Sequence, residues 1–128
     1  MTDQAATLLI LLFLGHFLGD FTPLATARML EAKLTGSPIG PIALHALVHA
    51  VLVGLAVAAI ARPVPMFILA AVSVEFWTHL GLDWVKGKMS VRRPGLGDPG
   101  QSIFWTALGI DQFAHALVLV GIAFLALM

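Results

Sequence analysis

Four pairs of ionisable side chains, each spaced four residues apart, lie inside segments that are otherwise apolar. The pairs fall in the blocks GHFLGDF, HALVH, HLGLD and DQFAH, and they are His16 with Asp20, His45 with His49, His79 with Asp83, and Asp111 with His115. Residues four apart on a helix project from one face, about one turn from each other. Each pair would therefore direct two imidazole or carboxylate groups the same way, as metal coordination or proton transfer requires.

Cations or protons must accompany these groups if the segments cross a membrane. An ionised side chain at the centre of a bilayer costs about 2.5–3.5 kcal/mol even on the insertion scale. Glu75 lies one turn from His79, and with the three paired aspartates it makes four carboxylates, whose charge two divalent ions would neutralise. Cysteine is absent. This excludes thiolate ligands and thiol nucleophiles, and leaves nitrogen and oxygen donors for zinc, iron or manganese.

The sequence predicts a dinuclear metal centre of the kind that facing helices build in four-helix bundles. Its cofactors would be two divalent transition-metal ions, with zinc favoured over iron and manganese. The expected metal ligands are His16, Asp20, His45, His49, His79, Asp83, Asp111 and His115. Glu75 is expected to act as the catalytic general base. A metal-free relay of histidine and aspartate is the main alternative. Bis-histidine haem ligation is a weaker one, because it leaves three aspartates without a role.

The composition places these segments in a membrane. Hydrophobic residues make up 59% of the 128 residues and charged residues 11%, and the mean hydropathy is +0.97. These values differ from those of a typical soluble domain. Each crossing of a bilayer needs about 20 apolar residues, so the length permits only a few spans. The first apolar run follows no basic segment and carries His16 and Asp20, so we expect a retained span rather than a cleaved signal peptide.

The predicted fold class is an all-α integral membrane protein. It is an antiparallel four-helix transmembrane bundle with a short interfacial helix between spans one and two. The segment PLATARMLEAKLTG would form that helix and end at Gly36 and Pro38. The segment KGKMSVRRPGLGDPGQ is expected to be a mobile loop, and Arg62 with Pro63 closes the second span. The single transmembrane domain, 1–128, would contain spans at about 5–21, 41–61, 64–85 and 102–127.

Alternating span directions would bring all four pairs to one level. The pairs stand near the ends of the first and third spans and in the early turns of the second and fourth, roughly 6–12 Å inside the helix ends at 1.5 Å rise per residue. Most basic residues of the chain belong to that end, namely Arg28, Lys33, Lys86, Lys88, Arg92 and Arg93. The positive-inside rule then places this end in the cytoplasm and both termini outside it.

The four blocks GHFLGDF, HALVH, HLGLD and DQFAH, in this order and at this spacing, resemble the pattern of the small bacterial membrane proteins called domain of unknown function 3307. The resemblance covers almost the whole chain. It implies a multi-pass protein of the bacterial inner membrane with no assigned activity. The run FTPLATARM, after Asp20, lacks a Gln-Thr step that is common in the family.

The expected function is a membrane-embedded, metal-dependent hydrolase of a lipid or another amphiphile. Membrane lipid is the expected partner, with an anionic headgroup held at the basic loop by Arg92 or Arg93. No nucleic-acid partner is expected, and a homo-oligomer is left open. A divalent-metal carrier or sensor and a structural metal site that stabilises the bundle are alternatives from other classes, and iron would suit di-iron oxidase chemistry. The apolar outer halves of the spans disfavour transport, which needs a polar path.

Overall fold

Helices form all the regular structure in the described residues, 3–61 and 65–128, of the computed structural model. The elements are α1 (Asp3–Phe21), α2 (Ala27–Thr35), α3 (Ile39–Ile60), α4 (Pro65–Arg92), the 3₁₀ turn η1 (Pro94–Gly97) and α5 (Ser102–Ala126). Four of these helices, α1, α3, α4 and α5, are long and apolar enough to cross a membrane. The expected end of the second span at Arg62 and Pro63, and the start of the third at residue 64, lie outside the described residues.

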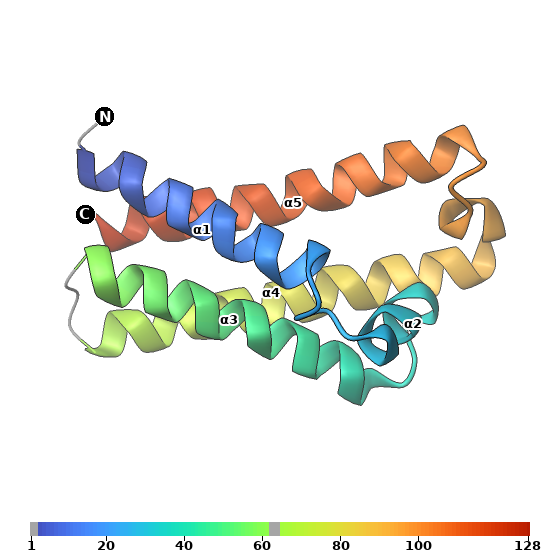
Figure 1. Ribbon diagram of the computed structural model, residues 1–128, viewed down its shortest axis with the longest axis horizontal. Helices are drawn as coiled ribbons and strands as arrows, with labels where there is room; N and C mark the ends of the chain where they lie inside the picture. The colour runs from blue at the N-terminus through green and yellow to red at the C-terminus, as the bar shows by residue number, and fades with distance from the viewer. Residues whose placement is uncertain (1–2, 62–64) are drawn as a thin grey trace.

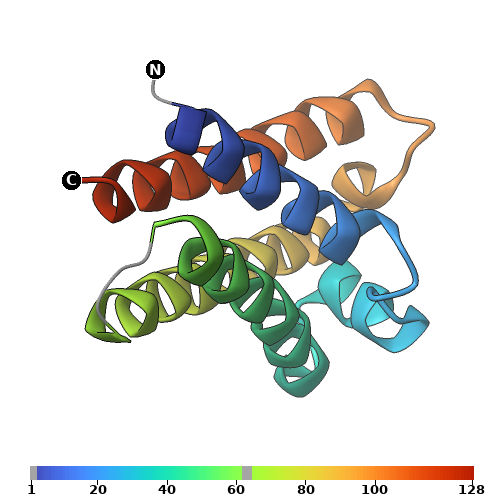
Figure 2. The same ribbon diagram turned by 60° about the vertical axis from the view of Figure 1, so that its left-hand side comes forward.

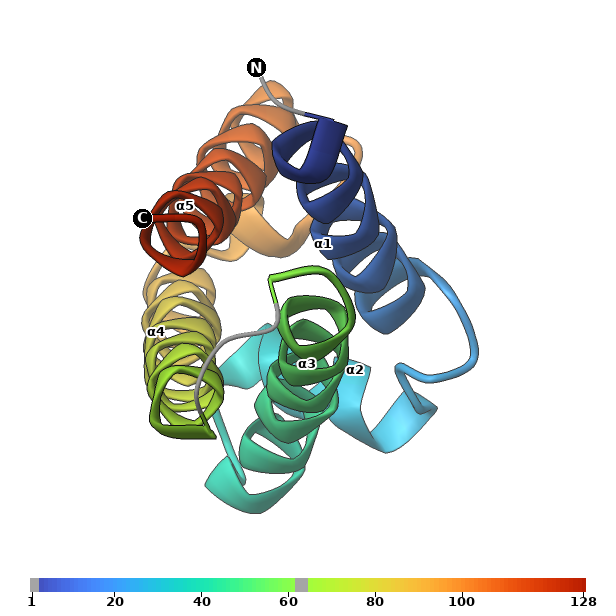
Figure 3. The same ribbon diagram turned by 90° about the vertical axis from the view of Figure 1, so that its left-hand side faces the viewer.

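The four long helices lie lengthwise beside one another (Figure 1). Contacts join α3 to α4 and α1, and join α5 to α4 and α1, so the helices surround a common centre in the view along the long axis (Figure 3). Both termini lie at one end of the molecule, and α2 and η1 lie at the other (Figure 1). Figure 2 shows α2 beside α3 and α4, which it contacts.

The centre of the molecule changes from apolar to polar along its length. Near the termini, a cluster of buried apolar side chains consists of Leu8, Leu12, Val53, Ala56, Val57, Ala71, Leu119, Ile122 and Ala123. Further along the long helices, the buried residues include a group of polar ones: His45, His49, Glu75, His79, Asp83, Ser90, Asp111 and His115. Helices α3, α4 and α5 therefore each supply residues to both parts.

The outer surface of the long helices is apolar. Large side chains that are 42–68% exposed include Phe13, Phe17, Leu55, Trp77, Ile110, Phe113 and Phe124. A soluble bundle has the opposite arrangement, because large exposed apolar patches and buried ionisable groups are both unfavourable in water. The distribution is compatible with a multi-pass membrane protein.

The short helix expected between the first two spans is confirmed as α2. The side chain of Thr26 caps its start by accepting a hydrogen bond from the backbone N–H of Met29 (3.4 Å). Gly36 ends the helix in the left-handed conformation (φ 65°), which glycine adopts without steric cost.

The expected loop after the third span is wrong in its first part, since α4 continues as a helix to Arg92. No proline interrupts this stretch before Pro94, which begins η1. Gly87 also packs against α2, where an added Cβ would lie 2.3 Å from the backbone nitrogen of Gly36 and 2.6 Å from the carbonyl oxygen of Lys33. Glycine at position 87 therefore allows α4 and α2 to approach closely, and this tertiary contact supports a helix that composition alone does not predict.

Candidate metal centre

The five imidazole rings lie together in one buried cluster. The ring of His79 lies at its centre, with centroid separations of 3.8 Å to His49, 4.3 Å to His115, 5.2 Å to His45 and 5.7 Å to His16. These rings come from four helices and from all four sequence pairs. The structure therefore brings together the histidines that the spacing singles out.

Three overlapping groups of side chains in this cluster have donor atoms within 4.8 Å of one another, close enough to share a metal ion. The first group is His16, His49, Glu75 and His79, the second is Asp20, His45, His49 and His79, and the third is His79, Asp83 and His115. His79 belongs to all three. Of the nine expected site residues, Asp111 is the one that belongs to none of the groups found among the described residues.

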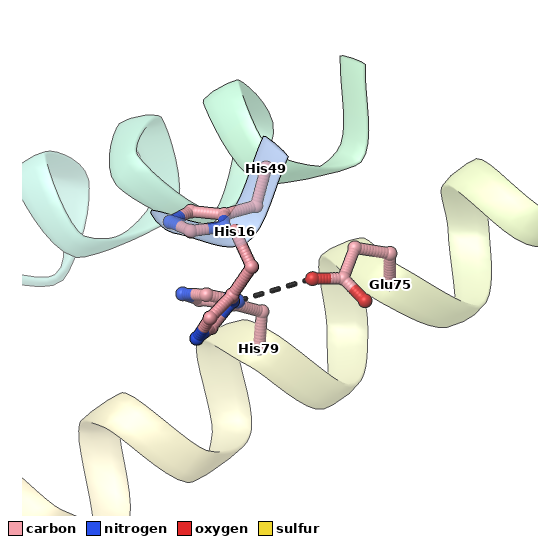
Figure 4. A group of neighbouring side chains, drawn as sticks. All are labelled: His16, His49, Glu75 and His79. Atoms are coloured by element: carbon pink, nitrogen blue, oxygen red, sulfur yellow. Dashed lines mark hydrogen bonds and ion pairs between the residues drawn. The ribbon is translucent and has the colours of Figure 1, made fainter. Parts of the chain in front are cut away.

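The first group combines three imidazoles with one carboxylate (Figure 4). Oε1 of Glu75 lies 3.1 Å from Nδ1 of His79, and both side chains come from α4. His16 directs Nε2 toward Oε1 of Gln112 at 3.1 Å, and its Nδ1 has no hydrogen-bond partner in the described part of the chain. Imidazole and carboxylate donors around one point are the ligand set that zinc takes in many enzymes.

The second nitrogen of each imidazole in this group faces a polar side chain. Gln112 is the neighbour for His16, Asp83 Oδ2 lies 3.4 Å from Nε2 of His79, and Asp20 Oδ1 lies 3.5 Å from Nε2 of His49. Protein groups that face the second ring nitrogen of a histidine commonly fix its tautomer and orientation when the first binds a metal. Both the donor atoms of the group and the polar side chains around them are therefore suited to metal coordination.

Lys33, on α2, reaches into the cluster, and the sequence does not single it out as a site residue. Its Nζ lies 2.9 Å from Oδ1 of Asp20, 2.9 Å from Nε2 of His45 and 3.2 Å from Oδ2 of Asp83. Burial alone would lower the pKa of Lys33, but the carboxylates of Asp83 and Asp20 raise it above its usual value. The side chain is therefore an ammonium ion among the expected ligands.

Asp111 pairs with a second lysine. Its Oδ2 lies 2.7 Å from Nζ of Lys86, and the side-chain amide of Gln112 donates both to Asp111 Oδ2 (3.3 Å) and to Asp20 Oδ2 (3.2 Å). Nδ1 of His115 donates to the backbone carbonyl of Asp111 (2.8 Å), and its buried Nε2 has no hydrogen-bond partner among residues 3–61 and 65–128. This arrangement makes Asp111 the partner of a cation that the protein itself supplies.

The two lysines change the charge balance on which the expectation of two ions depends. Asp20, Glu75, Asp83 and Asp111 are buried or nearly so, and only Lys33 and Lys86 form lysine ion pairs with them. With ionised carboxylates and neutral imidazoles, four negative and two positive charges leave a net charge of −2. One divalent ion is sufficient to neutralise it.

The burial pattern of α2 explains the position of Lys33 once the structure is known. Met29 and Lys33 lie four residues apart on one face, and Met29 is buried, whereas Leu30 and Leu34 are 43% and 55% exposed. A lysine on the same helix face as a buried residue must find a partner inside. From the sequence alone, Lys33 is used only as a charge that sets membrane orientation, so it is not identified as a partner of buried carboxylates.

A cavity of about 230 Å³ leads to the lysine side of the cluster. Its polar wall includes Asp20, Lys33, Lys86 and Gln112. The rest of the wall is mainly apolar and comes from α1, α2, η1 and α5, with Phe21, Leu30, Leu34, Leu96, Phe104 and Leu108. The cavity therefore joins an apolar surface to charged groups of the site.

A comparison with known protein families gives a match for this chain. The family model described as "Protein of unknown function (DUF3307)" matches residues 8–128, nearly the whole chain. No curated protein matches the chain, and no solved structure matches it.

Proposed function

The chain belongs to the family described as protein of unknown function (DUF3307), and from that premise we propose that it is a membrane-embedded metal-binding protein. The ion is a divalent transition metal, with zinc favoured over iron and manganese. Its ligands are the first group, His16, His49, Glu75 and His79. The observation that carries the proposal is the convergence of three imidazoles and a carboxylate, from three helices, on one buried point.

Two features favour the first group over the other two. In the described part of the chain, no hydrogen bond or ion pair joins its residues to a lysine, whereas Lys33 contacts Asp20 and His45 of the second group and Asp83 of the third. The net charge of −2 also calls for one divalent ion rather than two. The dinuclear arrangement expected from the sequence would need Lys33 to leave.

We further propose that α1, α3, α4 and α5 cross the bacterial inner membrane as an antiparallel bundle. Their apolar outer surfaces would face lipid. The end that carries α2 and η1 would lie in the cytoplasm, because Arg28, Lys88, Arg92 and Arg93 belong to it and the positive-inside rule favours that side. Both termini would then lie outside the cytoplasm.

Elemental analysis of the detergent-purified protein tests the metal proposal. Protein expressed with added zinc and freed of loose metal should contain one transition-metal ion per chain, and a chelator should remove the ion and lower the melting temperature together. A folded, thermally stable protein that contains no transition metal would refute the proposal.

The cavity favours an enzyme among metal-binding proteins, namely a hydrolase of an amphiphile. An acyl chain could lie along its apolar wall while the polar end of the molecule reaches Asp20 and Lys33. A bound divalent ion would supply an activated water and polarise a carbonyl or phosphoryl oxygen. The ammonium of Lys33 would attract a negatively charged oxygen of the substrate.

Replacing Leu108 with tryptophan should fill the cavity and leave the metal in place. With p-nitrophenyl palmitate in detergent micelles as the probe, we expect zinc-dependent release of p-nitrophenol by the native protein and at least a tenfold loss in the variant. Metal content, measured in parallel, should stay at the native value. Equal turnover by both proteins would show that the substrate does not bind in this cavity. If neither protein hydrolyses the ester, the hydrolase proposal is wrong and a structural metal site remains as the function.

The substitution Glu75→Gln distinguishes the two roles open to this carboxylate. Its position 3.1 Å from His79 Nδ1 places it among the donors of the first group, so we expect zinc affinity to fall at least tenfold, because a neutral amide is a weaker ligand than a carboxylate. Full zinc content with lost hydrolysis would instead support the general base that the sequence suggests.

A further inference from the structure

We infer that Asp20, His45 and Asp83 form a second metal position, and that the ammonium group of Lys33 occupies it in the conformation described here. The inference rests on the proposed function, since it concerns the same cluster. It adds a second ion site beside the first group and assigns to α2 the control of access to it.

The contacts of Lys33 are those of a cation among ligands. Asp20 Oδ1 and His45 Nε2 each lie 2.9 Å from Nζ, and they lie 2.9 Å from one another. When both accept hydrogen bonds from the ammonium, two acceptors face each other at short distance, which only a shared positive charge makes favourable. Donor atoms bound to one metal ion about 2.1 Å away are themselves about 3.0–3.4 Å apart. The spacing of Asp20 and His45 is therefore close to that of two metal ligands.

Asp83 also contacts Nζ, although it belongs to a different donor group from Asp20 and His45. Asp83 Oδ2 lies 3.2 Å from Nζ and 3.6 Å from His45 Nε2. The side chains of Asp83 and His45 are both fully buried. Nδ1 of His45 has no hydrogen-bond partner among the described residues. A histidine that accepts at Nε2 carries its proton on Nδ1, which is the tautomer that coordinates a metal through Nε2. With Nε2 accepting from Lys33, His45 would present to an ion the same nitrogen that it presents to the ammonium.

Charge explains why either the lysine or a second ion is present. With Lys33 in place, one divalent ion balances the cluster. If the ammonium leaves, the net charge falls from −2 to −3, so one divalent ion leaves an uncompensated charge of −1, and a second ion would change it to +1. Buried charge of this kind is strongly unfavourable in a low-dielectric interior. Withdrawal of Lys33 therefore creates the space for a second cation and a negative charge that attracts it.

The position of Lys33 depends on how closely α2 approaches α4. Gly87 of α4 lies against the end of α2, and an added Cβ there would lie 2.3 Å from Gly36 N and 2.6 Å from the carbonyl oxygen of Lys33 itself. Both distances are too short for any real Cβ, and backbone atoms cannot rotate out of the way. A methyl group at position 87 must displace α2, and Lys33 with it.

Zinc stoichiometry tests the inference. The full-length protein in detergent, equilibrated with excess zinc and then freed of unbound metal, is compared with its Lys33→Met variant by elemental analysis. Lys33→Met, which removes the charge and keeps much of the side-chain length, should bind one more zinc ion per chain than the native protein. Lys33→Arg, which keeps the charge, should bind the native number. Lys86→Met is the matched control, because its partner Asp111 belongs to none of the donor groups, and it should also bind the native number.

A second pair of variants covers the case in which Lys33→Met does not fold. Gly87→Ala should gain an ion by displacing α2, whereas Gly81→Ala, on the same helix with open space around the added Cβ, should not. Equal zinc content in the native protein, Lys33→Met and Gly87→Ala would overturn the inference even if all of them hold one ion. Absence of zinc from the native protein would instead overturn the proposed function, so the two failures are distinguishable.

Discussion

The His79→Ala variant is expected to lose its bound metal and to melt about 10 °C or more below the native protein. His79 is 1% exposed and is the residue shared by all three donor groups, so its removal weakens every ion position at once. An ion present at 1,000 times its dissociation constant contributes about 4 kcal/mol to the stability of the folded state. For a chain of this size, such a loss corresponds to a shift of this order in melting temperature.

His115→Ala is the matched control for this prediction. His115 is equally buried, at 2% exposure, and its ring lies 4.3 Å from that of His79, but it does not belong to the first group. It should therefore retain about one ion per chain by elemental analysis, while its melting temperature falls only by the cost of the cavity. Metal retention in His79→Ala, or equal metal loss in both variants, would contradict the assignment of the ion to the first group.

A single methyl group added at Gly19 should reduce zinc affinity at least tenfold. The new Cβ would lie 2.4 Å from both Cε1 and Nε2 of His49, so the imidazole must move away from α1. His49 supplies a donor to two of the three groups, and forced movement of a packed side chain typically costs about 1–3 kcal/mol. Competition with a zinc-binding dye would measure the affinity.

The control for Gly19→Ala is Gly121→Ala on α5, where the added Cβ meets none of the described residues of other elements within 4 Å. Alanine at a helical position open to its surroundings is neutral or slightly stabilising. We expect native zinc affinity in that variant. If Gly19→Ala also binds zinc normally, the ring of His49 is not held where the donor group needs it.

The helices and the convergence of the histidines follow from local features of the sequence. Long apolar runs must satisfy their backbone hydrogen bonds internally, which makes them helices. A spacing of four then places both members of each pair, such as His16 and Asp20, on one helix face. The ring contacts around His79 show that histidines from different helices meet.

The lysines could not be assigned in the same way, because their partners are far away in the sequence. Lys33 pairs with Asp83, fifty positions later, and only the docking of α2 onto α4 brings them together. Composition near Lys86 indicates a loop, yet the contact between Gly87 and Gly36 accompanies a helix there. A hydropathy profile treats every lysine as a surface charge. It does not show whether a buried carboxylate elsewhere in the fold will pair with that lysine.

The apolar packing between the termini and the histidines closes one end of the cluster. Leu8, Leu12, Val57 and Leu119, all at most 1% exposed, close the bundle at the end that carries the termini. Transfer of hydrated ions or protons among such apolar side chains is strongly unfavourable. If the long helices cross a membrane as proposed, whatever loads or empties the imidazoles would come from the compartment that faces α2. The protein would respond to the chemistry of that compartment and be insulated from the other.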